Sequence, residues 1–231
     1  MLDIKKPGMI ISLCVLATGC ASQMGSNPPV VKLDPKYTQG SAEQLFSTGE
    51  KYAKGIGVTR NYAEAANYYR GAAQKGDAKA EYALGYMYRT GHGVPRDYNA
   101  AAQWFERAAA QGNSDAEYSL GVRYMLGQGT PQDNSKALQW FEKAAGQGNP
   151  YAENQLGFMY AAGKNVPQNY GTSIGWYQKA ADHGLASAQY NLALMYSNGI
   201  GTPVDKAKAK QLFAMAAAKG FDPAKQVAEQ N

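Results

Sequence analysis

The sequence predicts an all-α fold built from repeated pairs of antiparallel helices. First, the segment 78–113 matches the chain again after each shift of 36 residues, and five such copies follow one another without insertion or deletion. Second, apolar residues within each copy recur at helical offsets of three, four, seven and eight. A fixed period of this length is typical of solenoids, in which each unit buries its apolar face only against its neighbours.

The first half of each copy is predicted to be one helix. With Ala78 counted as position 1, position 7 is leucine in four copies and position 11 is tyrosine in all five. A glycine inside a helix costs about 1 kcal/mol relative to alanine. Its recurrence at position 8 therefore predicts that another backbone passes close by. These glycines are Gly49, Gly85, Gly121 and Gly157, with Ala193 in the fifth copy.

A turn and a second helix are predicted to follow. Position 14 is always glycine, which indicates a left-handed helix end, and position 20 is always Asn or Asp, which favours a cap on the second helix. A second constant glycine at position 35 ends that helix, so each helix has roughly 13 residues. Trp104, Trp140 and Trp176 share position 27 and are predicted to pack between repeats.

The predicted repeats cover residues 42–221. Their boundaries are 42–77, 78–113, 114–149, 150–185 and 186–221. The remaining residues, 222–231, are predicted to form a C-terminal capping helix, the first helix of an incomplete sixth unit. Asp222 suits the cap of that helix and Pro223 its first turn.

The recurring strings A-x-Y-x-L-G-x-x-Y, G-x-G-V-P-x-D-Y and A-x-x-W-F/Y-x-x-A-A-x-x-G closely resemble the Sel1-like repeat, a relative of the tetratricopeptide repeat. The resemblance implies a right-handed α-α superhelical solenoid that acts as a non-enzymatic adaptor. The chain departs from the family pattern at a few positions. The departures are Gln44 and Thr48 in the first copy, Asn165 in the fourth and Leu212 in the fifth.

Two alternatives follow from the same resemblance. One bacterial branch of the family is cysteine-rich and associated with β-lactam binding or hydrolysis. This chain has no cysteine after Cys20, so it would be a cysteine-free relative of that branch. The other alternative is a secreted or surface-exposed host-interaction factor.

Residues 1–19 are predicted to be a lipoprotein signal peptide. Lys5 and Lys6 precede an apolar run at Met9–Ala17, which is too short to span a bilayer. The sequence up to Cys20 resembles a bacterial lipoprotein cleavage box, with an ordinary cleavable signal peptide as the alternative. Cys20 is therefore the predicted lipid attachment site. Ala21 would be the second residue of the mature chain, a pattern that resembles signals for delivery to the outer membrane. We favour its periplasmic face.

Residues 20–40 are predicted to be the lipidated N-terminus and a flexible tether, because prolines and glycines replace helical periodicity there. A chain of this length has a mean reach of about 25 Å.

A partner-binding groove is the leading functional hypothesis. In the tetratricopeptide arrangement, which the resemblance implies here, first helices line the concave face. A peptide or helix would be anchored there by Tyr86, Val122 and Phe158 and positioned by Arg89, although position 9 could instead pack between first helices. The predicted groove residues are Tyr82, Tyr86, Arg89, Tyr118, Val122, Met125, Asn154, Phe158, Tyr190 and Leu194.

Other function classes find little support. The only histidines are His92 and His183; neither has a helix-spaced metal partner, and His183 is predicted to stabilise a helix end through its charge. No nucleophile motif or phosphate-binding loop occurs. The net charge of +5 is spread without a basic block. We therefore predict no catalysis, metal, cofactor or nucleic acid, and a monomeric solenoid rather than end-to-end self-association.

Overall fold

The computed structural model describes residues 32–229. Within them it contains eleven α-helices and one 3-10 helix, and no strand. None of the helices in this range is long and apolar enough to cross a membrane. The predicted signal peptide, the lipid site at Cys20 and most of the tether lie outside the described residues.

Ten of the helices form five successive pairs of 13-residue helices, as the sequence predicts. The pairs are α1 (Ala42–Lys54) with α2 (Tyr62–Gln74), α3 (Ala78–Thr90) with α4 (Tyr98–Ala110), α5 (Ser114–Leu126) with α6 (Asn134–Gly146), α7 (Pro150–Ala162) with α8 (Tyr170–Asp182), and α9 (Ala186–Asn198) with α10 (Lys206–Ala218).

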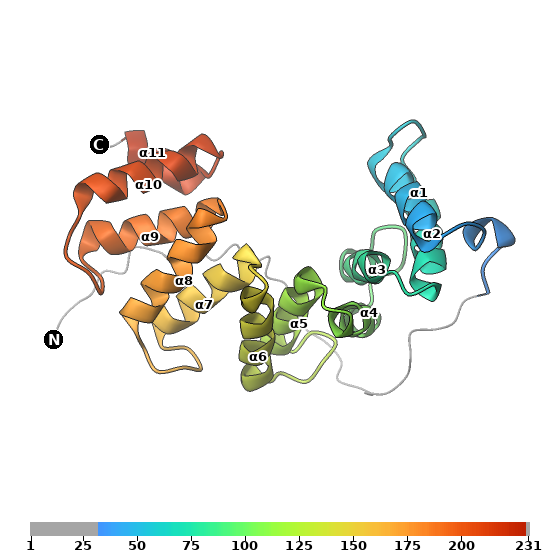
Figure 1. Cartoon of the computed structure of the whole chain (residues 1–231), viewed down its shortest axis with the longest axis horizontal. Coiled ribbons are helices and arrows are strands. Elements are labelled where there is room, and N and C mark those ends of the chain that lie inside the picture. The colour runs from blue at the N-terminus through green and yellow to red at the C-terminus, as the bar shows by residue number, and fades with distance from the viewer. Residues whose placement is uncertain (1–31, 230–231) are drawn as a thin grey trace. The chain divides into compact units, whose positions relative to one another are not determined.

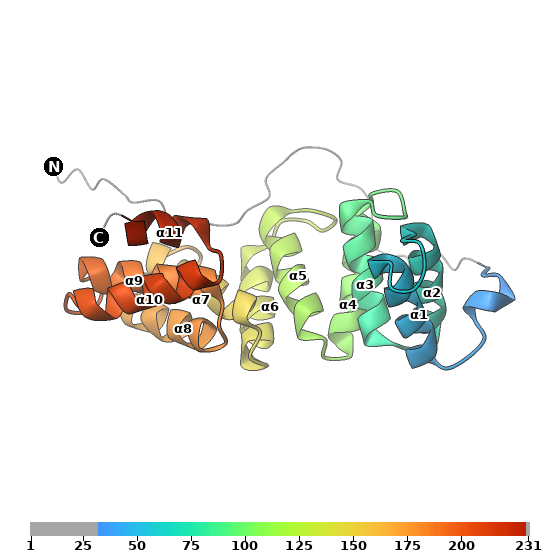
Figure 2. The ribbon, with the colours of Figure 1, turned by 90° about the horizontal axis from the view of Figure 1, so that it is seen from above.

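The chain divides into two compact units, an N-terminal unit that includes residues 32–147 and a C-terminal unit that includes residues 148–229. In each unit, consecutive helices pack on one another, both within and between repeats. Figures 1 and 2 show α3 beside α4 and α5 beside α6, and α9 beside α10 in the other unit. This successive packing confirms the solenoid class of fold.

The second helices begin where the sequence predicts caps. In each repeat the position-20 side chain accepts hydrogen bonds from the first amides of its helix, which satisfies donors that no helical carbonyl can reach. The capping residues are Asn61, Asp97, Asp133, Asn169 and Asp205.

The first helices end in a left-handed residue, also as predicted. The position-14 glycine is the C-cap of every first helix, with φ between 64° at Gly163 and 78° at Gly91. Asn165 in the following loop has φ 65° and is the single non-glycine with positive φ among the described residues. Asparagine tolerates this conformation better than most residues, so this departure from the repeat pattern leaves the loop intact.

The glycine within each first helix gives room to an aromatic ring. A Cβ built on Gly85 would lie 2.6 Å from the Phe105 ring, and one on Gly157 would lie 2.6 Å from the Tyr177 ring. The predicted close approach is therefore confirmed, but the predicted neighbour was wrong. The aromatic ring at repeat position 28, which lies on the second helix, fills the space, and not another backbone.

The core joins adjacent repeats. Leu84 and Leu120 are fully buried. Trp104 belongs to a cluster that also contains residues of α1, α2 and α3, and Trp140 packs against a cluster from α4 and α5. The predicted packing between repeats is thus confirmed for Trp104 and Trp140.

A short 3-10 helix, η1 (Pro35–Tyr37), packs on α2 at the N-terminal end of the described chain. Tyr37 is 7% exposed, its ring meets the Tyr68 ring edge-on at 5.0 Å, and its hydroxyl donates to the Glu64 carboxylate at 3.0 Å. The end of the segment predicted as a tether is therefore folded. The burial of the Tyr37 side chain orders this segment. A single contact of this kind leaves no periodic pattern in the sequence, so it could not be predicted from periodicity.

At the other end, α11 (Asp222–Glu229) packs on α10, as expected for the first helix of a sixth unit. Ala224 is fully buried, at the alanine position of the repeat. Asp222 is the first residue of this helix, not its cap, and forms an ion pair with Lys225 at 2.9 Å.

Candidate interaction groove

A cavity of about 530 Å³ opens on the first-helix side of the N-terminal unit. Three elements supply most of its lining, namely α1, α3 and the start of α5, and α2 and the α3–α4 loop close one side. The lining residues are Phe46, Glu50, Ala53, Tyr62, Tyr69, Lys79, Tyr82, Ala83, Tyr86, Met87, His92, Asn113 and Asp115. The lining is largely apolar and aromatic, with a few charged groups, as is usual for binding pockets.

Two predicted groove residues, Tyr82 and Tyr86, line this cavity. Tyr86 is 42% exposed, and the Arg89 guanidinium lies 4.7 Å from the centre of its ring. Tyr82 is half-buried and packs at 5.8 Å against the Phe105 ring. Burial, with a smaller contribution from Asp115, raises the pKa of Tyr82 to about 12. Tyr82 is thus a fixed wall of the cavity, and Tyr86 offers an accessible aromatic face.

The predicted residues of α5 lie outside this lining. Tyr118 packs against Phe141 at 5.8 Å, as Tyr82 packs against Phe105 one repeat earlier. Val122 and Met125 are half-buried.

In the C-terminal unit the predicted groove residues are mostly in contact with other side chains. Phe158 and Leu194 pack against the core of that unit. Tyr190 is 8% exposed and lies between Phe213 and Phe221, and Asn154 accepts a hydrogen bond of 3.2 Å from Asn191. Position 9 is therefore accessible in the second repeat and largely used for packing in the fourth and fifth.

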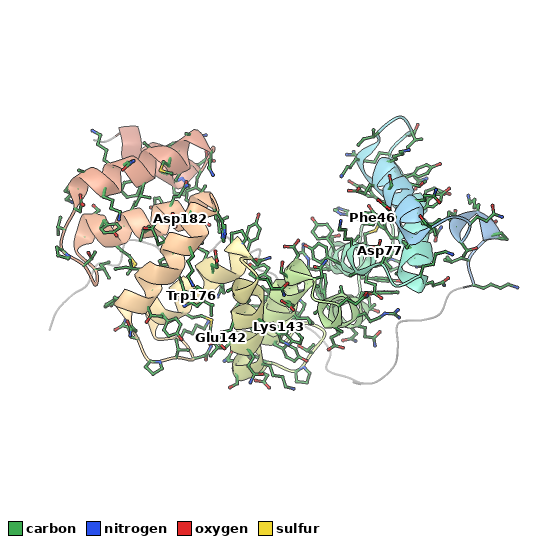
Figure 3. All side chains as sticks on the ribbon, in the orientation of Figure 1. Phe46, Asp77, Glu142, Lys143, Trp176 and Asp182 are labelled. Atoms are coloured by element: carbon green, nitrogen blue, oxygen red, sulfur yellow. The ribbon has the colours of Figure 1, made fainter. Side chains whose placement is uncertain are left out.

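Sequence reasoning missed the contribution of the first repeat. Phe46, Glu50 and Ala53 line the cavity from α1, where Figure 3 labels Phe46. They occupy positions 5, 9 and 12, which are the positions predicted for the groove in the other repeats. The available signal was the register itself, applied to the first copy as well.

The two histidines have different surroundings. The His92 ring stacks on Tyr62 at 5.0 Å and lines the cavity. His183 Nδ1 lies 2.9 Å from Oε2 of the buried Glu153, a partner that its predicted role at a helix end did not include. Within residues 32–229, no group of three or more His, Cys, Asp or Glu side chains is placed to hold a metal ion.

The family model described as Sel1 repeat matches residues 45–77, 78–113, 114–149, 150–185 and 186–221. Each match corresponds to one observed helix pair and ends directly before the next helix. None of the curated proteins compared with the chain is a match.

Solved structures share the fold. A Sel1 repeat protein from Oxalobacter formigenes is 33% identical with a TM-score of 0.77, over 80% of this chain and 75% of that one. A protective antigen present in uropathogenic Escherichia coli strains, described as displaying an SLR fold, is 38% identical with a TM-score of 0.73 over 81% of this chain. This chain spans 40% of the length of that antigen. An immunity protein from Pseudomonas aeruginosa is 25% identical with a TM-score of 0.57, over 84% of this chain and 69% of that one.

Proposed function

Because the chain belongs to the Sel1-repeat family, whose fold is a protein-interaction scaffold and is generally non-enzymatic, we propose that it is an adaptor of the bacterial cell envelope. Its first helices bind a peptide or a helix of a partner protein. The Tyr86 side of the cavity between α1 and α3 is the centre of that contact.

The exposure of Tyr86 is the observation that carries this proposal. The residue is 42% exposed at the edge of a largely apolar cavity, whereas Tyr69 and Tyr190 are buried. Aromatic anchors beside a concave apolar surface are the usual centres of protein interfaces. A partner side chain that enters the cavity would cover Tyr86 and remove apolar surface from water.

The envelope location rests on the N-terminal sequence, in which Cys20 follows a short apolar run. A lipid on Cys20 would anchor the chain, on the outer membrane by the sorting pattern and with the periplasmic face favoured. Replacement Cys20→Ala should then abolish metabolic labelling with palmitate and release the chain from the membrane fraction. Labelling that persists without Cys20 would contradict the anchor.

A surface-exposed host-interaction factor is the second candidate. The similarity to a protective antigen of uropathogenic strains favours it, since a protective antigen has to be accessible to the host. Protease treatment of intact cells separates the two candidates. A chain on the cell surface is degraded, and a periplasmic chain survives until the outer membrane is opened.

Site-specific photocrosslinking in living cells tests the interaction face. A photoreactive amino acid at Tyr86 should capture one or a few defined partners. The matched control is Met215, which is 43% exposed on the second helix α10 and lies outside the cavity lining. Because the two side chains are equally exposed, random collisions should label both positions equally.

Capture from position 86 but not from position 215 is the expected result. Equal crosslinking from both positions, or crosslinking from position 215 alone, would contradict the proposed face. The replacement Tyr86→Ala should also reduce co-purification of the captured partner while the helical content and melting temperature stay near those of the natural chain.

A further inference from the structure

Arg123 in α5 is a buried cation whose donors are not fully used. It is 5% exposed, and its Nε and Nη1 atoms are buried without a hydrogen-bond partner within the described part of the chain. Its guanidinium lies over the Tyr98 ring at 5.5 Å. Burial, and then the nearby charge of Arg89, lowers the pKa of Arg123 to about 10, so this residue stays charged at neutral pH.

The repeat pattern indicates that an apolar side chain suits the place of Arg123. Arg123 occupies position 10, and the same position holds Met87, Met159 and Met195 in three other repeats, each at most 4% exposed. An unbranched apolar side chain therefore satisfies this place in the core. An arginine here costs free energy, because a buried cation loses its hydration and gains no anion in return.

The same register places Arg123 on the first-helix side. Met87, its equivalent one repeat earlier, is 4% exposed and yet lines the cavity described above. The guanidinium is also within the field of Arg89, which itself lies over the ring of the cavity residue Tyr86. Two ring–guanidinium pairs, Tyr86 with Arg89 and Tyr98 with Arg123, are thus within electrostatic range of each other, and we name these four residues the arginine–tyrosine site.

We propose that the arginine–tyrosine site receives the carboxylate of an acidic side chain in the bound partner. This inference rests on the proposed function and specifies its chemistry. A guanidinium forms strong charge-assisted hydrogen bonds with a carboxylate, and the Nε and Nη1 donors of Arg123 have no hydrogen-bond partner within the described part of the chain. The pairing regains the free energy that the isolated cation loses on burial.

The local charge selects a carboxylate. Arg89 and Arg123 carry two positive charges, and Asp115, whose charge acts on the neighbouring Tyr82, carries one negative charge. The arginine–tyrosine site itself contains two cations and no acidic residue, so it attracts an anionic group of the partner. The tyrosine rings on either side favour an aromatic or aliphatic residue next to the acidic residue in the partner.

The test uses a bead-displayed library of random peptides with amidated C-termini, so that Asp and Glu side chains are the only carboxylates. The full chain should enrich peptides with an acidic residue beside an aromatic or aliphatic one. The replacement Arg123→Met introduces the side chain that three other repeats already hold at this position. It should weaken the enriched peptides at least tenfold, and should leave their Asn or Gln versions unchanged.

Thermal unfolding provides a second, independent readout. If the charge of Arg123 serves a ligand, Arg123→Met should raise the melting temperature of the unliganded chain by about 2 °C or more. A structural role for the guanidinium predicts the reverse, so a lower melting temperature with an intact circular dichroism spectrum would overturn the inference.

The outcomes separate this inference from the proposed function. Peptides that need Tyr86 but show no acidic preference, or that bind Arg123→Met equally well, overturn the carboxylate site and leave the adaptor intact. Tighter binding of phosphoserine than of glutamate at the same position would assign the site to phosphate instead and would also overturn it. A library that yields no Tyr86-dependent peptide contradicts both.

Discussion

Glu81, Glu117 and Glu153 occupy position 4 in three repeats and are at most 2% exposed. Each has a basic partner on the second helix of its own pair or, for Glu153, directly after that helix. The distances are 2.9 Å from Arg107 Nε to Glu81, 2.9 Å from Lys143 Nζ to Glu117 and 2.9 Å from His183 Nδ1 to Glu153. These contacts tie the two helices of a repeat together at the end opposite the loop that joins them.

The partner of Glu117 also touches a tryptophan. Lys143, labelled on α6 in Figure 3, lies 5.0 Å from the centre of the Trp140 ring. Its Nζ approaches Glu117 Oε1 to ion-pair distance without the angles of a hydrogen bond, and Gln147 donates to the other oxygen at 2.5 Å. Lys143 therefore neutralises a fully buried carboxylate while its own side chain stays half exposed.

The replacement Lys143→Met should destabilise the chain by about 1–3 kcal/mol, because it leaves the buried Glu117 carboxylate without its cation. The fifth repeat already combines an amide with a methionine at these two places, Gln189 and Met215. The double variant with Glu117→Gln and Lys143→Met should therefore recover most of the loss. Urea denaturation of the single and double variants measures both effects.

Lys136 provides the matched control, since its side chain is 50% exposed and that of Lys143 is 51% exposed. It lies on the same helix but pairs at 3.9 Å with Asp133, which is itself partly exposed. Lys136→Met should change stability by less than about 1 kcal/mol. Equal effects of the two lysine replacements would show that Glu117 is not stabilised by its partner.

At the scale of the element, the glycines of α7 and α8 distinguish packing from helix propensity. A Cβ on Gly157 in α7 would meet the fully buried Tyr177 ring at 2.6 Å, whereas a Cβ on Gly175 in α8 would meet nothing within 4 Å. The same chemical change should therefore have opposite signs in two helices of one repeat.

Gly157→Ala should lower the free energy of unfolding by about 1–3 kcal/mol through overpacking, and Gly175→Ala should raise it by about 0.5–1 kcal/mol through helix propensity. Denaturant unfolding of both variants provides the measurement. The fifth repeat holds Ala193 at the place of Gly157, so the fold can adapt to a Cβ where the ring is free to shift. A Gly157→Ala variant as stable as the natural chain would show that Tyr177 moves aside as well.

The elements were predictable from the sequence because their signals are local. A cap such as Asp97 acts on amides two and three residues away, and a terminator such as Gly91 acts on its own φ. The candidate site was less predictable because it depends on contacts between repeats. Tyr86 is accessible while Phe158, at the same position, packs against the core, and Arg123 at a methionine position gave no signal until its surroundings were known.

At the scale of the whole molecule, the described chain is closed at both ends by small additions to the repeats. Tyr37 covers α2 from η1, and Phe221 and Ala224 extend the core beyond α10. An α-helical repeat lacks a neighbour at the end of its array, so these additions bury apolar surface that the repeats alone would expose.

Removal of either end should loosen only the adjacent repeat, because stability in repeat proteins is a sum of unit and nearest-neighbour contributions. A chain that stops at Gly220 loses Phe221, whose ring lies 5.4 Å from that of Tyr190. Amide hydrogen exchange should then become faster in α9 and α10 and stay unchanged in α1–α4. Deletion of residues 32–40 is the matched change and should accelerate exchange in α1 and α2 alone. Equal acceleration throughout both units in either variant would show that the five repeats unfold as one cooperative body and that neighbour-by-neighbour stability does not describe this chain.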